Sequence, residues 1–109
     1  MVRLTVTLTA PSRRYAQDVI EAFRFLMIGI RLEPGCAGCT VWVDGESEVH
    51  YVEEWESELD MRRRVRSQRF TSLLGLIESA HEPPRVQFDF VSSTRGLDYV
   101  TQVRNNGLP

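Results

Sequence analysis

A strict alternation of polarity at the start of the chain is the feature that most restricts its fold. Val2, Leu4, Val6 and Leu8 alternate with arginine and threonine, and a period of two is typical of a β-strand that buries one face. The same alternation is unlike the continuous apolar core of a secretory signal, and the longest apolar run, residues 25–28, is far too short to cross a bilayer. We therefore expect a cytoplasmic protein, with no membrane partner, built around a sheet.

The next part of the sequence predicts a helix followed by a β-hairpin. Ser12 opens a stretch in which apolar residues recur at steps of three and four. This helix must stop before residues 33–35, Glu-Pro-Gly, because proline disfavours the helical conformation of the residue before it. Residues 39–44 and 49–55 are rich in β-branched and aromatic side chains. A short polar connection with a glycine, residues 45–48, joins the two runs as in a hairpin.

A second helix and a fourth strand complete the pattern. Ser57, with an acidic residue three positions later, resembles a capping box, and we expect its helix to break near Ser67 and resume. Residues 85–91 then alternate in polarity again. The order β-α-β-β-α-β predicts one α+β domain, residues 1–109, of ferredoxin-like topology. In this topology an antiparallel four-stranded sheet carries both helices on one face.

The sheet face without helices predicts an assembly. Such a face must be polar or must be buried against a partner. Val41 or Trp42, together with Val52 and Val91, remain for that face once the helix side is filled. We therefore expect a homodimer formed through the sheet faces. The tail, residues 94–109, contains enough apolar side chains to dock on the partner or on its own sheet.

The charged residues and the cysteines exclude several kinds of partner. The chain has thirteen basic residues, all arginine, and a net charge of −2, so it has no general attraction to phosphate backbones. Cys36 and Cys39 fit a redox pair, half of a metal site, or two small buried residues. We favour the last, because His50 and His81 show no ligand spacing to the cysteines and a strand follows Cys39. We therefore expect no nucleic-acid partner and no metal.

Residues 34–79 resemble the centre of antibiotic biosynthesis monooxygenase domains. The shared features are a Pro-Gly-Cys turn, a strand pair, the strand end Glu53-Glu54-Trp55, a serine at a helix start, and Ser67-x-x-Phe70 before an apolar helix. With the flanking strands the resemblance covers most of the chain. It implies a dimeric α/β barrel of two sheets packed face to face, with a substrate cavity between each sheet and its helices. Members include cofactor-free oxygenases of polycyclic phenols, quinol monooxygenases, haem-degrading enzymes and proteins of no established activity.

The resemblance also implies where a site would lie. Trp55 matches the tryptophan that lines the pocket of catalytic members, and Tyr51 lies on the same strand face, where relatives place a polar substrate contact. Many relatives carry two histidines in the second helix, and Arg64 and Arg69 occupy their positions here. Arginine stays protonated, so it can bind an anion or stabilise an oxyanion but cannot serve as a general base or an ordinary haem ligand. Haem degradation is therefore not expected.

The function implied is a cofactor-independent monooxygenase acting on a small aromatic, phenolic or quinol substrate. We expect no cofactor, because the reaction needs only an apolar pocket, a base and a group that stabilises the substrate anion. Glu53 is a candidate base if it is buried beside an arginine, but we favour a surface ion pair, because carboxylates are mostly solvated. The candidate catalytic residues are Trp55, Tyr51, Arg69 and Arg64, and the candidate substrate-binding residues are Phe23, Phe70, Phe88 and Glu53.

Other interpretations of the same residues stay open. The aromatic residues also fit an ordinary core, and the arginines of residues 62–69 fit a solvated helix face with one or two pointing inward. Because the family histidines are missing, a non-catalytic small-molecule binding or regulatory dimer of the same fold is the alternative function. An RNA-binding module is disfavoured by the carboxylates of Glu53 and Glu54 on the third strand.

Overall fold

A computed structural model of the chain describes residues 1–45, 47–93 and 95–105. Glu46 of the expected connection, and residues 94 and 106–109 of the expected tail, lie outside the described residues. The elements are β1 (Val2–Thr9), α1 (Arg13–Ile30), β2 (Cys36–Asp44), β3 (Glu48–Trp55), α2 (Glu58–Arg66), α3 (Gln68–Glu78), β4 (Arg85–Phe90) and α4 (Leu97–Asn105).

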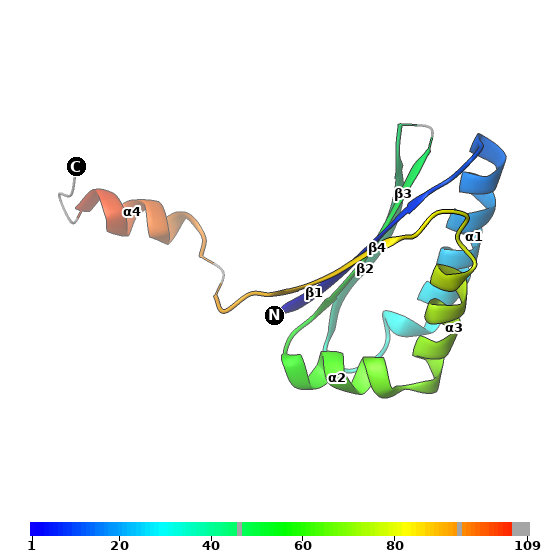
Figure 1. The fold of residues 1–109 in the computed structure, drawn as a ribbon. Helices are drawn as coiled ribbons and strands as arrows, with labels where there is room; N and C mark the ends of the chain where they lie inside the picture. The colour runs from blue at the N-terminus through cyan, green and yellow to red at the C-terminus, as the bar shows by residue number, and fades with distance from the viewer. Residues whose placement is uncertain (46, 94, 106–109) are drawn as a thin grey trace.

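The four strands form one open antiparallel sheet in the order β2-β3-β1-β4, and α1, α2 and α3 lie on one of its faces (Figure 1). This arrangement confirms the predicted α+β, ferredoxin-like topology. β2 begins at Cys36, earlier than the expected residue 39, because a register irregularity between Cys36 and Gly38 lets the pairing with β3 continue. Within this one chain the sheet does not close into a barrel.

β1 and β3 form the centre of the sheet and supply most of its buried face. Along β3 the side chains of Val49, Tyr51, Glu53 and Trp55 are at most 1% exposed. Alternate residues of a strand point to opposite faces, so these four all face the helices. In the register between the strands Glu53 lies opposite Leu4, which is itself fully buried. A carboxylate therefore lies in the middle of the apolar layer.

α1 packs mainly over β2 and β3. It begins at Ser12, whose side-chain oxygen accepts a hydrogen bond from the Tyr15 amide at 3.1 Å. Its periodic apolar stripe faces the sheet, as the sequence predicts. The buried residues of α1 are Ala16, Val19, Phe23, Met27 and Ile30.

The turn after α1, residues 31–35, is held tightly against α2. Gly35 has a φ of +85°, a conformation that L side chains rarely adopt, and a Cβ there would overlap the Asp60 carboxylate. The Gly35 carbonyl also accepts a hydrogen bond from the Glu56 amide at 2.8 Å. Glycine at this position therefore allows the turn to cover the end of β3 closely.

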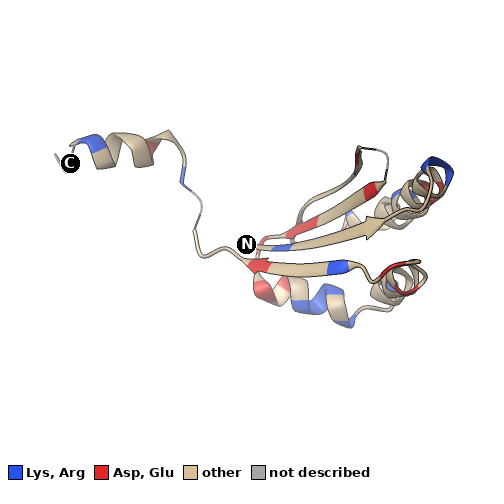
Figure 2. Cartoon of the chain, turned by 45° about the horizontal axis from the view of Figure 1, so that its top comes forward, with Lys and Arg blue, Asp and Glu red and all other residues tan. Residues whose placement is uncertain are grey.

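α2 and α3 are separated at Ser67, where the sequence predicts a break. Ser67 has extended backbone, with φ −72° and ψ 154°, and its side-chain oxygen caps α3 by accepting from the Phe70 amide. Acidic residues lie in the first turn of α2 and arginines in its last turn (Figure 2), an order that complements the helix dipole. The break changes the chain direction, so α2 covers the end of β3 and α3 packs beside α1.

The sheet face without helices carries Trp42 and Val52. Of the two residues that the sequence offered for this face, Val41 and Trp42, the structure places Trp42 there. Val41 lies on the helix side instead, because its partner in the register is the buried Tyr51. Trp42 is 46% exposed and stacks on the His50 ring, with centroids 5.2 Å apart. The uncovered face is therefore part apolar and part polar.

α4 lies beyond the end of the sheet and does not pack on it (Figure 1). None of its residues is buried, and its apolar side chains Leu97, Tyr99, Val100 and Val103 are all exposed. Among the described residues, no helix combines the length and the apolar character that crossing a membrane requires.

Candidate functional site

The centre of the candidate site is a buried ion pair between β3 and α2. The Arg64 Nε atom lies 3.0 Å from Glu53 Oε1, and the Nη2 atom lies 2.9 Å from Oε2. The side chains of Arg64 and Glu53 are 1% and 0% exposed. The favoured prediction that Glu53 lies at the surface is therefore wrong. Strand alternation places Glu53 with Tyr51 and Trp55, and α2 supplies the guanidinium that compensates the buried carboxylate.

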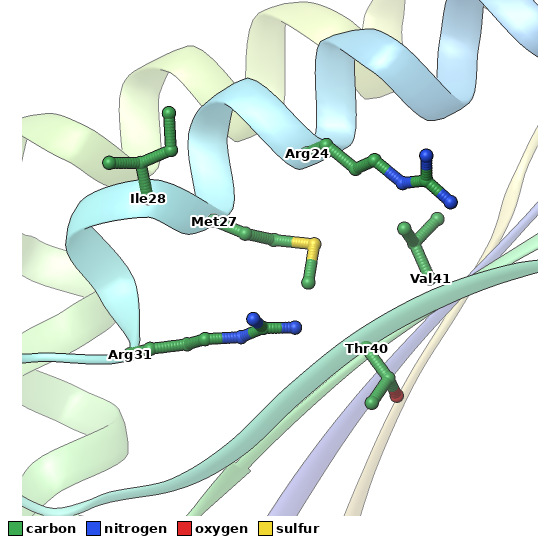
Figure 3. A pocket seen from close by; sticks show the side chains of 6 residues that line it. All are labelled: Arg24, Met27, Ile28, Arg31, Thr40 and Val41. Atoms are coloured by element: carbon green, nitrogen blue, oxygen red, sulfur yellow. The ribbon is translucent and has the colours of Figure 1, made fainter.

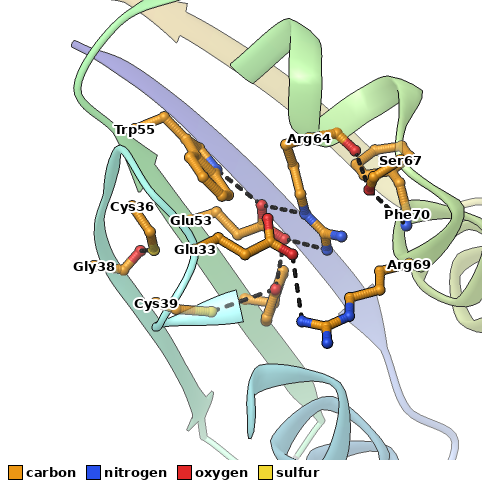
Figure 4. A network of polar contacts seen from close by, with 11 residues as sticks. Glu33, Cys36, Gly38, Cys39, Glu53, Trp55, Arg64, Ser67, Arg69 and Phe70 are labelled. Carbon is orange, nitrogen blue, oxygen red and sulfur yellow. Dashed lines mark hydrogen bonds and ion pairs between the residues drawn. The ribbon is translucent and has the colours of Figure 1, made fainter. Parts of the chain in front are cut away.

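Two further donors complete the surroundings of the Glu53 carboxylate (Figure 4). The Tyr51 hydroxyl donates to Oε2 at 2.6 Å, and the Trp55 indole nitrogen donates to Oε1 at 3.0 Å. Each carboxylate oxygen thus accepts two hydrogen bonds, which is close to the full capacity of a carboxylate. Glu53 has no lone pair free to take a proton from a ligand, so its role is to hold Arg64 and not to act as a base.

Arg64 keeps one nitrogen unpartnered. Its Nη1 atom is buried and, within the described part of the chain, has no hydrogen-bond partner. Burial acts to lower the pKa of Arg64, but the hydrogen bonds and negative charge of Glu53 outweigh it, so the pKa is raised overall. The guanidinium therefore stays charged, fixed by Glu53 and by the Phe70 ring, whose centroid is 5.1 Å away. A buried donor without an acceptor is costly, so Nη1 is suited to receive a ligand oxygen.

Tyr51 lies beneath this pair and not in contact with open space. Its ring stacks on Phe23 with centroids 4.6 Å apart, and its hydroxyl accepts a hydrogen bond from Cys39 Sγ at 3.3 Å while donating to Glu53. Burial, and then the charge of Glu53, raise the pKa of Tyr51. Tyr51 therefore stays a phenol, and its hydroxyl is committed to the network.

Both cysteines are free thiols. Burial raises the pKa of Cys39 to about 11, and burial likewise raises the pKa of Cys36. A thiol reacts as its thiolate, so neither residue is activated for redox chemistry at neutral pH. Of the three stated roles for the pair, a small buried residue fits Cys39, while Cys36 is only half-buried.

A cavity of about 220 Å³ reaches the ion pair between the 31–35 turn and α2. It is smaller than the roughly 300–1,000 Å³ usual for ligand sites. Trp55 and Arg64 are both among its lining residues. The lining residues are Glu33, Pro34, Trp55, Asp60, Arg63, Arg64 and Ser67.

Glu33 is a candidate that the sequence analysis did not identify. Its Oε1 atom lies 3.4 Å from the Arg69 Nη1 atom, and Figure 4 places its carboxylate beside the Arg64 guanidinium. The side chain is 25% exposed, so it meets both solvent and the cavity. The signal available in the sequence was an acidic residue in the turn directly before the Pro-Gly-Cys motif. By itself, its position before proline indicates only the end of a helix.

The structure brings together most, but not all, of the predicted site residues. Phe23 and Phe70 lie in the core around the Glu53–Arg64 pair. Arg69 is 62% exposed and contacts Glu33 at the surface, so it does not share the buried site with Arg64. Phe88 faces the helix side of the edge strand β4, where it is 38% exposed and is separated from Glu53 by Leu4.

The fold and the buried site together define a small ferredoxin-like α+β domain that presents a fixed guanidinium to a cavity. A family model for antibiotic biosynthesis monooxygenase matches residues 1–74. The chain belongs to this family. A comparison with curated proteins gives no match.

Solved structures share the fold. A proposed antibiotic biosynthesis monooxygenase from Deinococcus radiodurans aligns with a TM-score of 0.75 and 17% identity, covering 88% of this chain and 97% of that one. A conserved protein from Methanosarcina mazei aligns with a TM-score of 0.69 and 18% identity, covering 81% of this chain and 89% of that one. Another antibiotic biosynthesis monooxygenase aligns with a TM-score of 0.66 and 21% identity, covering 85% of this chain and all of that one (100%). At these identities the similarity establishes the fold alone.

Proposed function

We propose that this family member is a cofactor-independent monooxygenase of a small aromatic phenol or quinol. The observation that carries the proposal is the buried, unpartnered Nη1 atom of Arg64, a residue that Glu53 holds in place and that lines a cavity together with Trp55. A fixed donor of this kind stabilises a substrate oxyanion without reorganising as charge develops. Trp55 would provide the aromatic wall against which a ring packs.

The chemistry asks little of the protein. The anion of a quinol or of an electron-rich polycyclic phenol can reduce dioxygen itself. One oxygen atom then enters the substrate, two substrate hydrogens are lost, and the second oxygen leaves as water. Arg64 holds the phenolate oxygen, and Glu53 and Tyr51 are positioning residues that hold Arg64. Glu33 is the proposed base, because within the described part of the chain only its Oε1 atom has a hydrogen-bond partner, and the residue lines the same cavity.

The test is oxygen consumption by the purified protein against a panel of quinols, anthrones and flavonoid-like phenols. Glu33→Gln should lower kcat by roughly 10²-fold, the lower end of the usual contribution of a general base. Glu58→Gln is the matched control, because Glu58 is an exposed carboxylate that pairs with Arg62 on the outside of α2. Equal loss in both variants, or in neither, would contradict the assignment of Glu33.

A non-catalytic binding protein is the second candidate. The observation that favours it is the complete hydrogen bonding of Glu53, which leaves the buried network with no proton acceptor of its own. If no phenol is turned over but phenols still quench Trp55 fluorescence, the protein binds its ligand without oxidising it.

We also propose that two copies assemble through the sheet faces that lack helices. Trp42, on the edge strand β2, is 46% exposed on that face, and Val52 of the neighbouring strand β3 is half-buried. Burial against a second copy removes this apolar surface from water. α4 is proposed to dock on the partner copy, because a nine-residue helix is marginal alone and its apolar side is uncovered in its own chain.

A further inference from the structure

A second cavity lies between α1 and the edge strand β2, outside the proposed active site (Figure 3). Its volume is about 450 Å³, within the range usual for ligand sites. We call it the α1–β2 groove. The residues that line it are Arg24, Met27, Ile28, Arg31, Thr40 and Val41.

Two guanidinium groups enter the groove, one from Arg24 of α1 and one from Arg31, the residue directly after this helix. Arg24 and Arg31 lie seven residues apart, about two helical turns, and Figure 3 shows both side chains extended toward β2. The Arg31 Nε and Nη2 atoms donate to the Cys39 carbonyl oxygen at 3.2 and 2.8 Å. Arg24 has no hydrogen bond or ion pair with any described residue. None of the described lining residues is acidic, so the two positive charges have no counter-charge within the groove.

The remaining walls of the groove are apolar. Met27 is 5% exposed and forms part of the core beneath the opening, and the half-buried Val41 lines the groove from the strand, while the side chain of Ile28 points away from β2 (Figure 3). A ligand that fits these walls has an apolar body that packs on Met27 and Val41. Its anionic end would lie between the two arginines, since guanidinium groups bind planar carboxylates with two parallel hydrogen bonds.

The contact between Arg31 and Cys39 distinguishes a small ligand from a docked peptide. An extended peptide that adds to the edge of β2 needs the outward carbonyl groups of that strand. The Cys39 carbonyl already accepts two hydrogen bonds from Arg31, so strand addition is blocked at this position. We infer that the α1–β2 groove binds a small amphipathic carboxylate, which Arg24 and Arg31 hold by its anionic end.

The test uses naphthalene-2-carboxylate as the probe and two spectroscopic reporters in the full chain. Met27 is the groove methionine, so its methyl resonance reports the groove, while the Trp55 indole reports the Arg64 cavity. Titration should move the Met27 signal in a saturable manner. The dissociation constant should rise at least about 10-fold in Arg24→Gln, the effect of losing a charge-assisted hydrogen bond. Arg14→Gln, an exposed arginine of the same helix outside the groove lining, should leave it unchanged.

Two further probes separate charge from apolar contact. The neutral naphthalene-2-methanol has the same apolar body and should bind at least about 10-fold more weakly, and acetate should not saturate the Met27 signal. The inference is overturned if the Met27 signal does not move, if both arginine variants weaken binding equally, or if the neutral alcohol binds as well as the carboxylate. A shift of the Trp55 signal alone would place the probe in the Arg64 cavity and would also contradict binding in the α1–β2 groove.

Discussion

Gly29 makes room for Arg69. A Cβ at Gly29 would overlap the Arg69 guanidinium, which lies across α1 on its way to the Glu33 carboxylate. The absence of one side chain in α1 therefore allows an arginine of α3 to reach the turn that covers the candidate active site. Glycine in a helix interior otherwise lowers stability, so its presence here is explained by this close approach.

Gly29→Ala should separate these two effects. Alanine favours the helix by about 1 kcal/mol over glycine, and the exposed Arg69–Glu33 pair that it displaces contributes about 0–1 kcal/mol. The free energy of unfolding, measured with urea, should therefore stay the same or rise by up to about 1 kcal/mol. A loss above about 1 kcal/mol would show that the overlap cannot be relieved by movement of the Arg69 side chain alone.

Arg64→Met should be the most destabilising single change in α2. It leaves the Glu53 carboxylate buried with only two neutral donors, and an uncompensated buried charge costs about 3–5 kcal/mol. Arg62→Met is the control on the same helix, where the exposed pair with Glu58 contributes under about 1 kcal/mol. Urea unfolding followed by far-UV circular dichroism measures both. A similar cost for the two variants would contradict a structural role for the buried pair.

Stability should fall as the pH rises above about 9. The Cys39 thiol ionises near 9.0 when unfolded, but burial raises its pKa to about 11 in the folded chain. The folded state thus keeps a proton that the unfolded state loses, and a difference of two pH units corresponds to about 2–3 kcal/mol. Urea unfolding between pH 7 and 10 should show the decline in the wild-type chain. Cys39→Ala should reduce it, and an identical decline in both would exclude Cys39 as its source.

Val103→Asp should weaken assembly of two copies. Val103 is 41% exposed on α4, and a charge there opposes docking of the apolar side of this helix on a partner. The dimer dissociation constant, measured by analytical ultracentrifugation, should rise at least about 10-fold, the effect of losing one well-packed contact. Asn105→Asp adds the same charge on the side of α4 that faces away from Val103 and should have little effect. If neither variant alters the constant, α4 lies outside the interface.

The fold could be predicted from the sequence because its signals are local. The alternation in β1 and the helical stripe of α1 each depend on residues a few positions apart, and the break at Ser67 was visible as a change in the apolar pattern. The burial of the Glu53 side chain could not be predicted from neighbouring residues. Whether its side chain meets water or Arg64 depends on how α2 crosses the end of β3, and no short pattern contains that crossing.

The same reason explains the other differences at the candidate site. Arg64 and Arg69 lie five residues apart in the sequence, but the break at Ser67 sends one into the core and leaves the other at the surface. Glu33 and the α1–β2 groove were missed because each depends on a turn or helix approaching an element distant in the sequence. The alternation of polarity in residues 85–91 predicts that Phe88 lines the substrate cavity, but this pattern does not reveal that β4 is an edge strand.

The hydrogen bonds of the Ser67 hydroxyl determine which segment beside the cavity can move to admit a ligand. It donates to the last turn of α2, at the Arg64 carbonyl 2.6 Å away, and accepts from the first turn of α3 at 3.3 Å. This one oxygen atom contacts both helices, and movement of α2 away from the sheet would break the ion pair between Arg64 and Glu53. We therefore expect a ligand larger than the cavity of about 220 Å³ to displace the turn of residues 31–35. Exchange of the backbone amides in that turn should respond first when a guest enters.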